Sequence, residues 1–276
     1  MRKLFQAAGG YGPRWQEAML FRTREGLGFF QFARFARRPE IRHAVFTRLG
    51  GCSRGAFRGL NVGFDCGDER AAVVANRRLL VRAAGGGELV GLRQTHGTAL
   101  WVFTQEGPGN RSPQGPAASA DGAVTDVPGR LLLIQVADCQ SVMLYDPRRR
   151  VVANVHCGWR GSIANILGGA VALMEKRFGC HPETVMAGIG PSLGPCCAEF
   201  VNYRREIPEK FWGYRIGRDH FDFWALSRDQ LRTAGLPEDQ IACGQICSRC
   251  NPHLFFSYRR ARETGRFAAV IGLAEP

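Results

Sequence analysis

The stretch LLLIQVADCQSVMLYDPRRRVVANVHCGWRGSIANILGGAVALMEKRF, residues 131–178, determines the fold class of this chain. Apolar residues of Ile163–Phe178 recur at helical spacing, which indicates a helix with one apolar face. Three apolar runs of strand length precede this helix: Leu131–Ala137, Val142–Tyr145 and Val151–His156. Strands next to an amphipathic helix predict an α/β (α+β) fold with a mixed β-sheet and packed helices.

The flanks of this stretch indicate one domain. Residues 68–84 have helical spacing with Asp68 as a possible N-cap, and Ala268–Ile271 is typical of a last strand. Residues 1–20 lack periodicity, so we expect a flexible N-terminal extension. Residues 105–120 are rich in Gly and Pro, which favours an exposed loop. No repeat and no linker divides the chain, so residues 21–276 are predicted to form a single domain.

Composition restricts the class of protein. The 276 residues carry 37 Lys and Arg against 24 Asp and Glu, a net charge of +13, which suits an anionic partner such as phosphate. The arginines are scattered and no RNA-binding motif occurs, so nucleic acid is an unlikely partner. No apolar run reaches the ~18 residues of a membrane span, and no apolar segment follows Met1 as in a secretory signal. We therefore expect a cytoplasmic protein whose ten cysteines serve catalysis or metal binding rather than disulfides.

Three residues carry the chemistry that the sequence suggests: His96, Cys139 and His156. Each lies at or just beyond the end of an apolar, strand-like run, where a side chain reaches the rim of a sheet. Two imidazoles and one thiolate suit zinc, and three protein ligands leave a position for water or substrate, as in catalytic sites. From the residues alone, a Cys–His nucleophile pair and ordinary buried side chains are open alternatives.

The order of the motifs from Thr47 to the C-terminus resembles the YfiH-like family, also called laccase-domain or multicopper polyphenol oxidoreductase proteins and now regarded as purine nucleoside phosphorylases. The pairing of Ala-Asp-Cys with His-x-Gly-Trp-Arg-Gly is its most specific feature. The matching segments are Thr47-Arg48 through Gly50-Gly51, Leu60–Gly63, Gln94–Gly97, Ala120–Thr125, Ala137–Cys139, His156–Gly161, Gly190-Pro191 and Phe255–Arg260.

This resemblance implies a YfiH-like fold of the cysteine-hydrolase type and one zinc ion held by His96, Cys139 and His156, with copper as the older cofactor assignment. It implies a catalytic domain that cleaves purine nucleosides with phosphate, with adenosine, inosine, guanosine and methylthioadenosine as substrates. Adenosine deamination would be a second activity. A peptidoglycan-editing role has been attached to some members. The chain departs from the usual pattern at three positions, none of them a ligand: Gln140, Cys157 and Ala198.

Four further residues are candidates for substrate binding. The guanidinium groups of Arg48 and Arg160 match phosphate, although each could instead hold a glycine-rich turn. Asp138 could orient a ligand histidine or cap a strand end. Gln94 shares a strand face with His96, so it could face the site or solvent.

Other readings of the same residues stay open. Cys139 with a histidine base would make a hydrolase acting on an amide, and the basic charge would suit a non-enzymatic nucleic-acid or partner-binding module. A multicopper oxidase is disfavoured because three ligands cannot build several copper centres. The C-x3-C-x2-C-x2-H pattern from Cys243 to His253 could bind a second metal, but no distant second pair is evident. Adjacent Cys196-Cys197 would form a strained disulfide, so we expect them to be buried thiols.

Overall fold

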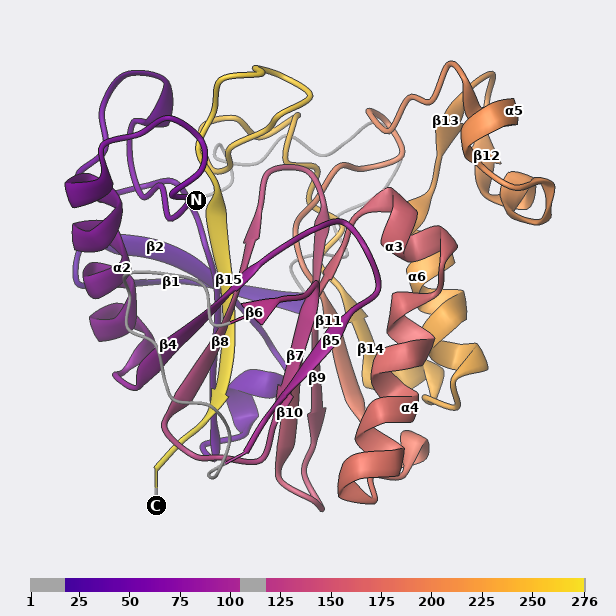
Figure 1. The fold of residues 1–276 in the computed structure, drawn as a ribbon, viewed down its shortest axis with the longest axis horizontal. Coiled ribbons are helices and arrows are strands. Elements are labelled where there is room, and N and C mark those ends of the chain that lie inside the picture. The colour runs from indigo at the N-terminus through magenta and orange to yellow at the C-terminus, as the bar shows by residue number, and fades with distance from the viewer. Residues whose placement is uncertain (1–17, 105–117, 276) are drawn as a thin grey trace.

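The structure, a computed structural model, describes residues 18–104 and 118–275. Two mixed β-sheets lie face to face at the centre (Figure 1). On one side lies α2 (Arg70–Ala84), and on the other lie α3 (Trp159–Ile163), α4 (Ile166–Phe178) and α6 (Phe223–Thr233). Most of the expected extension 1–20 and of the expected loop 105–120 falls outside the described residues. Within them, Met19 and Leu20 already belong to the first strand.

The first sheet has seven strands, with α2 packed on its outer face. Neighbours from β1 to β8 pair antiparallel, whereas β4 pairs parallel with both β8 and β6. In spatial order the strands are β1 (Met19–Arg24), β2 (Leu27–Phe32), β3 (Ile41–Phe46), β15 (Phe267–Leu273), β8 (Arg130–Val136), β4 (Glu88–Arg93) and β6 (Ala118–Ser119).

The second sheet has six strands, and a separate two-stranded ribbon joins β12 (Arg215–Ile216) to β13 (His220–Phe221). The strands of this sheet, in spatial order, are β14 (Ile241–Cys243), β11 (Met186–Ile189), β9 (Gln140–Asp146), β10 (Val151–Cys157), β7 (Gly122–Thr125) and β5 (Leu100–Phe103). The mixed α/β class is confirmed. The strands outside the two-stranded ribbon divide between two sheets, and the chain crosses from one of these sheets to the other between β8 and β9, at Cys139.

The two predicted helices, over 68–84 and 163–178, correspond to α2 and to α3 with α4, whereas α5 (Tyr203–Glu206) and α6 were not predicted. The α-helices are α2 (Arg70–Ala84), α3 (Trp159–Ile163), α4 (Ile166–Phe178), α5 (Tyr203–Glu206) and α6 (Phe223–Thr233). The short 3-10 helices are η2 (Phe35–Arg37), η3 (Gly55–Phe57), η4 (Pro182–Thr184), η5 (Glu209–Tyr214) and η6 (Glu238–Gln240). The predicted helix over 163–178 is interrupted at Asn165, which has a left-handed φ of 57° and caps α4 through its side chain. Asp68 does not cap α2, because its carboxylate accepts hydrogen bonds from Ser53 and Asn61 instead.

Alternation along the strands produces three apolar layers. In β9, Met143 and Tyr145 point into the core between the sheets, whereas Val142 and Leu144 pack under the helices on the other face. The two sheets are also joined by a buried polar residue of β10, Asn154, whose amide donates to the carbonyls of Leu132 and Ala269. Among the described residues, no helix is long and apolar enough to cross a membrane.

Candidate functional site

The structure brings His96, Cys139 and His156 together. Their ligand atoms all lie within 4.8 Å of one another, and the two imidazole rings meet edge to face with centroids 4.8 Å apart. His96 lies in the loop after β4, Cys139 lies in the crossing between the sheets, and His156 is near the end of β10. His156 is buried while His96 is exposed, so the cluster opens to solvent on the His96 side. Three segments distant in sequence thus form one site.

A buried carboxylate, that of Asp121, organises two of these segments. It accepts hydrogen bonds from the backbone N–H groups of Thr95 (3.2 Å), His96 (2.8 Å) and Gly97 (2.8 Å), and one from the Thr95 hydroxyl. Its Oδ1 also lies 2.8 Å from Nδ1 of His156. These contacts hold the His96 loop, in which His96 has a φ of 60°. They also favour a proton on Nδ1 of His156, which leaves Nε2 as the nitrogen available to a metal.

The charges of the cluster support one another. Burial raises the pKa of Asp121, but hydrogen bonds from His156, Gly97 and Thr95 outweigh burial and hold that pKa below its usual range. Burial likewise raises the pKa of Cys139, but His156 and His96 lower it to about 6. Burial lowers the pKa of His156, whereas Cys139 and Asp121 raise it to about 9. The thiolate of Cys139 is therefore favoured, which is the form that binds metals and acts as a nucleophile.

Gly158 gives the site its space. A Cβ atom at this position would lie 3.1 Å from Cδ2 of His96, 3.5 Å from Sγ of Cys139 and 3.5 Å from Cε1 of His156. The backbone between β10 and α3 therefore lies directly against all three candidate ligands, and any side chain would intrude among them.

Two residues that depart from the family pattern have structural roles. Cys157 points away from the cluster into the core under the helices, 3.3 Å from the Ser162 hydroxyl, and burial raises its pKa to about 12. Gln140 donates from its side chain to the carbonyl of Phe223, which anchors the start of α6. Neither side chain belongs to the cluster.

Of the four candidate substrate residues, three are held by the protein itself. Both oxygens of Asp138 are occupied, by the Ser248 hydroxyl at 2.7 Å and the backbone N–H of Arg259 at 2.6 Å. Asp138 was predicted to orient a histidine of the cluster, but the carboxylate that contacts His156 is that of Asp121. The side-chain amide of Gln94 pairs with the backbone of Gln135 in both directions, at 2.8 Å each.

The two arginines differ. The Arg48 guanidinium donates to the carbonyls of Arg58 and Pro252 and stacks on Phe256, so it holds the glycine-rich turn. Arg160 is exposed and lies over the Trp159 ring, 4.3 Å from its centroid. Within residues 18–104 and 118–275, no hydrogen bond or ion pair engages its guanidinium.

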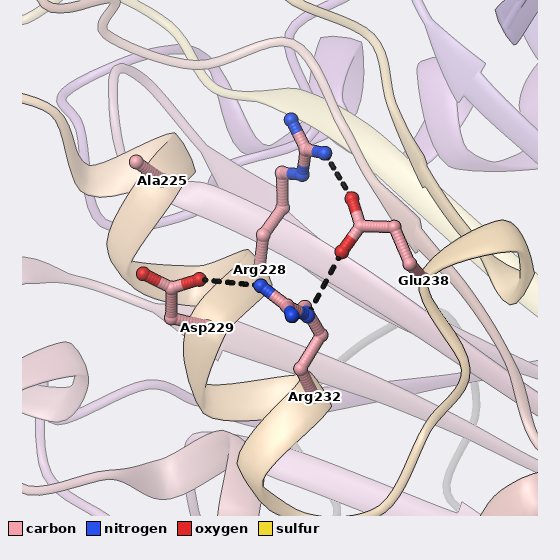
Figure 2. A pocket seen from close by; sticks show the side chains of 5 residues that line it. All are labelled: Ala225, Arg228, Asp229, Arg232 and Glu238. Atoms are coloured by element: carbon pink, nitrogen blue, oxygen red, sulfur yellow. Dashed lines mark hydrogen bonds and ion pairs between the residues drawn. The ribbon is translucent and has the colours of Figure 1, made fainter.

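A surface cavity lies elsewhere, along α6 (Figure 2). It is lined by Ala225, Arg228, Asp229, Arg232 and Glu238, and none of these is a candidate site residue. Glu238 pairs with both arginines, and Arg232 also pairs with Asp229. Because its charges neutralise one another, this cavity offers no free group for the predicted chemistry.

Two residues that shape the cluster, Asp121 and Gly158, were not predicted from the sequence. Both lie in quoted motifs, but neither has an evident role until the fold is known. One signal in the sequence could have pointed to Asp121: it directly precedes the apolar strand β7, so its carboxylate was open to burial, and a buried carboxylate needs several hydrogen-bond donors.

Known proteins resemble this chain over most of its length. Relatives include "Purine nucleoside phosphorylase YlmD" of Geobacillus stearothermophilus, which is 35% identical over 243 residues, covering 83% of this chain and 89% of the relative. "Purine nucleoside phosphorylase YfiH" of Escherichia coli (strain K12) is 33% identical over 241 residues, covering 82% and 91%. The crystal structure of YlmD from Geobacillus stearothermophilus superposes with a TM-score of 0.84 and 31% identity, covering 94% of this chain and 100% of that one.

The family assignment follows from a match over most of the chain. The family model described as multi-copper polyphenol oxidoreductase laccase matches residues 42–274. This match and the relatives confirm the resemblance found in the sequence motifs: the chain belongs to the laccase-like family that includes YfiH and YlmD.

Proposed function

We propose that the protein is a zinc-dependent purine nucleoside phosphorylase whose metal is held by His96, Cys139 and His156. One observation carries the proposal: the ligand atoms of these three residues lie within 4.8 Å of one another, and Asp121 contacts Nδ1 of His156, which leaves Nε2 for a metal. The names of the relatives support the reaction class. We propose adenosine, inosine, guanosine and methylthioadenosine as substrates, adenosine deamination as a second activity, residues 21–276 as the catalytic domain and the cytoplasm as its location.

The residues present fit a zinc ion. The donor set of one thiolate and two imidazoles is typical of zinc, and the pKa of Cys139 favours its thiolate at neutral pH. Gly158 keeps side-chain atoms out of the space between the ligands, and the exposed side at His96 leaves access for a substrate. When bound, zinc supplies a Lewis acid that can polarise a substrate oxygen.

Phosphorolysis needs a phosphate placed against C1′ of the ribose and a purine that leaves. Arg160 follows the metal-facing Gly158 by two residues, and its exposed guanidinium is suited to phosphate. Trp159 meets Phe200 edge to face at 5.8 Å, and these half-buried rings offer a surface on which a purine can stack. We propose Arg160 as the substrate-facing arginine, and structural roles for Arg48, Gln94 and Asp138.

Product analysis tests this function. The full-length protein is incubated with adenosine, with and without inorganic phosphate, and the products are separated by chromatography. Phosphate-dependent release of adenine and ribose 1-phosphate is expected, whereas inosine would report deamination. Arg160→Ala should raise the KM for phosphate, and Arg149→Ala is a matched control, because Arg149 is exposed and donates to Gly179 on another part of the surface. No adenine in the presence of phosphate and zinc would contradict the proposal.

A second candidate is favoured by one specific observation. His156 lies between Cys139 and Asp121 and contacts both, so that a thiolate lies beside a protonated imidazole. A Cys–His hydrolase has the same arrangement. Elemental analysis separates the two candidates and also distinguishes zinc from copper. Zinc that protects Cys139 from alkylation, and of which one ion per chain is lost in Cys139→Ala, supports the phosphorylase. Protein whose metal content is the same in wild type and Cys139→Ala, and that cleaves amides and is inactivated by alkylation, supports the hydrolase.

A further inference from the structure

A second group of four cysteines lies where two loops meet. Strands β11 and β14 pair parallel, and the loops that leave them continue side by side, with Ser192 bridged to Cys247. The first loop contributes Cys196 and Cys197, and the second contributes Cys247 and Cys250. The four sulfur atoms all lie within 4.8 Å of one another. The parallel pairing thus supplies the distant second pair of cysteines that the sequence does not reveal.

The spacing of the sulfurs fits a tetrahedral metal site. Sγ of Cys250 lies 3.7 Å from Sγ of Cys196 and 3.5 Å from Sγ of Cys197. A tetrahedral zinc ion with Zn–S bonds of about 2.3 Å places its sulfurs about 3.8 Å apart. A disulfide would need about 2.05 Å. The two distances from Cys250 are close to this tetrahedral spacing, the other pairs lie within 4.8 Å, and all four cysteines are free thiols.

The surroundings are those of a site for anionic sulfurs. The backbone N–H of Gly194 points at Sγ of Cys247, 3.3 Å away, and the Arg249 guanidinium lies 3.6 Å from Sγ of Cys197. A Cβ atom at Gly194 would lie 2.8 Å from the Trp224 ring and 3.1 Å from Cβ of Cys247, so only glycine allows this approach. Cys197 and Cys247 are buried whereas Cys196 is exposed, which leaves an entry path for a metal.

We propose that Cys196, Cys197, Cys247 and Cys250 bind one zinc ion in a structural tetrathiolate site. Four protein ligands close the coordination sphere, which distinguishes this site from the three-ligand cluster at His96. Zinc is favoured because it takes tetrahedral thiolate coordination without redox chemistry. Cys243 and His253, which complete the sequence pattern, do not belong to the group.

The bound metal would fasten the loops that support the catalytic cluster. Leu193 of the first loop donates its N–H to the carbonyl of Asp138 at 2.8 Å, and Ser248 of the second donates its hydroxyl to the Asp138 carboxylate. Asp138 has a φ of 91° and directly precedes Cys139. One ion that holds both loops therefore also holds the backbone that presents Cys139. We assign this metal a positioning role.

Metal counting on the full-length protein, purified without added metal, tests the proposal. Wild type is expected to hold two zinc ions per chain, and Cys139→Ala one. The Cys196→Ser/Cys250→Ser variant is expected to hold one and to have a lower Tm. Cys52→Ser, which changes an exposed cysteine outside both groups, is the matched control and should retain both ions.

A spectroscopic readout keeps the test independent of whether the double variant folds. Cobalt loaded into Cys139→Ala should show the strong thiolate-to-cobalt charge-transfer absorption of a tetrathiolate site. X-ray absorption of its zinc form should show only sulfur neighbours, at about 2.3 Å. Cys139→Ala that binds no zinc and shows no such absorption would overturn the proposal. A disulfide between Cys250 and Cys196 or Cys197, or iron in place of zinc, would overturn it as well.

Discussion

Replacing Asp121 by asparagine tests what holds His96, Cys139 and His156 in place. The carboxylate accepts from three backbone N–H groups, the Thr95 hydroxyl and Nδ1 of His156. An amide has one oxygen and one NH2 group. If the NH2 replaces Oδ2, two donors face each other, because the N–H of Gly97 points at this position. If the NH2 replaces Oδ1, it faces Nδ1 of His156 and favours the tautomer with its proton on Nε2. A protonated Nε2 cannot bind a metal.

The magnitude follows from these contacts. Loss of a carboxylate that orients a ligand histidine costs 10- to 100-fold in metal affinity, about 1.4–2.7 kcal/mol. A buried donor left without an acceptor costs about 1–3 kcal/mol of folding free energy. We therefore expect Asp121→Asn to weaken zinc binding by about 10- to 100-fold and to lower the free energy of unfolding by about 1–3 kcal/mol.

Two assays measure these effects. Competition with a chromophoric chelator gives the zinc Kd, in the Cys196→Ser/Cys250→Ser background so that one site reports. Urea denaturation gives the free energy of unfolding. Asp126→Asn makes the same chemical change at an exposed position and should alter neither quantity. A zinc Kd for Asp121→Asn within twofold of the parent would refute the positioning role of Asp121.

Two further predictions concern the same core and cluster. Gly158→Ala should lower zinc affinity at least about tenfold, because the added Cβ atom would lie 3.1 Å from Cδ2 of His96. Gly213→Ala, with open space around it, is the control and should not change zinc affinity. Equal zinc Kd values for the two variants would show that the ligands move aside. Burial lowers the pKa of His43 to about 3. Above pH ~6.5 His43 is neutral in the folded and the unfolded chain, so it does not affect the free energy of unfolding. Below that pH the unfolded chain binds a proton that the folded chain does not, so stability falls. Wild type should therefore lose about 2 kcal/mol more stability than His43→Gln between pH 8 and pH 5, measured by urea denaturation at each pH, and parallel losses would show that His43 titrates normally.

Local patterns predicted the elements of the fold but not their assembly. The apolar runs over 131–156 correspond to β8, β9 and β10, and α4 ends at Phe178, as predicted. The division into two sheets depends on pairing between distant strands, such as β15 with β3 and β8, which no local window contains. The helix break at Asn165 was hidden because apolar spacing continues on both sides of it.

The candidate site shows the same division. His96, Cys139 and His156 could be selected from the sequence, because their residue types suit one metal and they lie in the motifs that resemble the family. Their supporting contacts were not predictable, since Asp138 is adjacent to Cys139 in sequence whereas Asp121 reaches His156 through the pairing of β7 with β10. The second cysteine group was hidden for the same reason: the parallel pairing of β11 with β14 joins cysteines about fifty residues apart.

A pair of variants tests whether Cys139 holds a catalytic metal. Phosphorolysis of adenosine is measured together with zinc content for Cys139→Ala and Cys157→Ala. Because Cys157 points into the opposite core, its variant should keep zinc and most of its activity. The variant at Cys139 should lose one zinc ion and at least ~100-fold in kcat/KM, about 2.7 kcal/mol of transition-state stabilisation. Cys139→Ala that keeps both zinc ions while Cys157→Ala loses one would contradict the ligand assignment, and Cys139→Ala with unchanged kcat/KM would contradict a catalytic role for the metal.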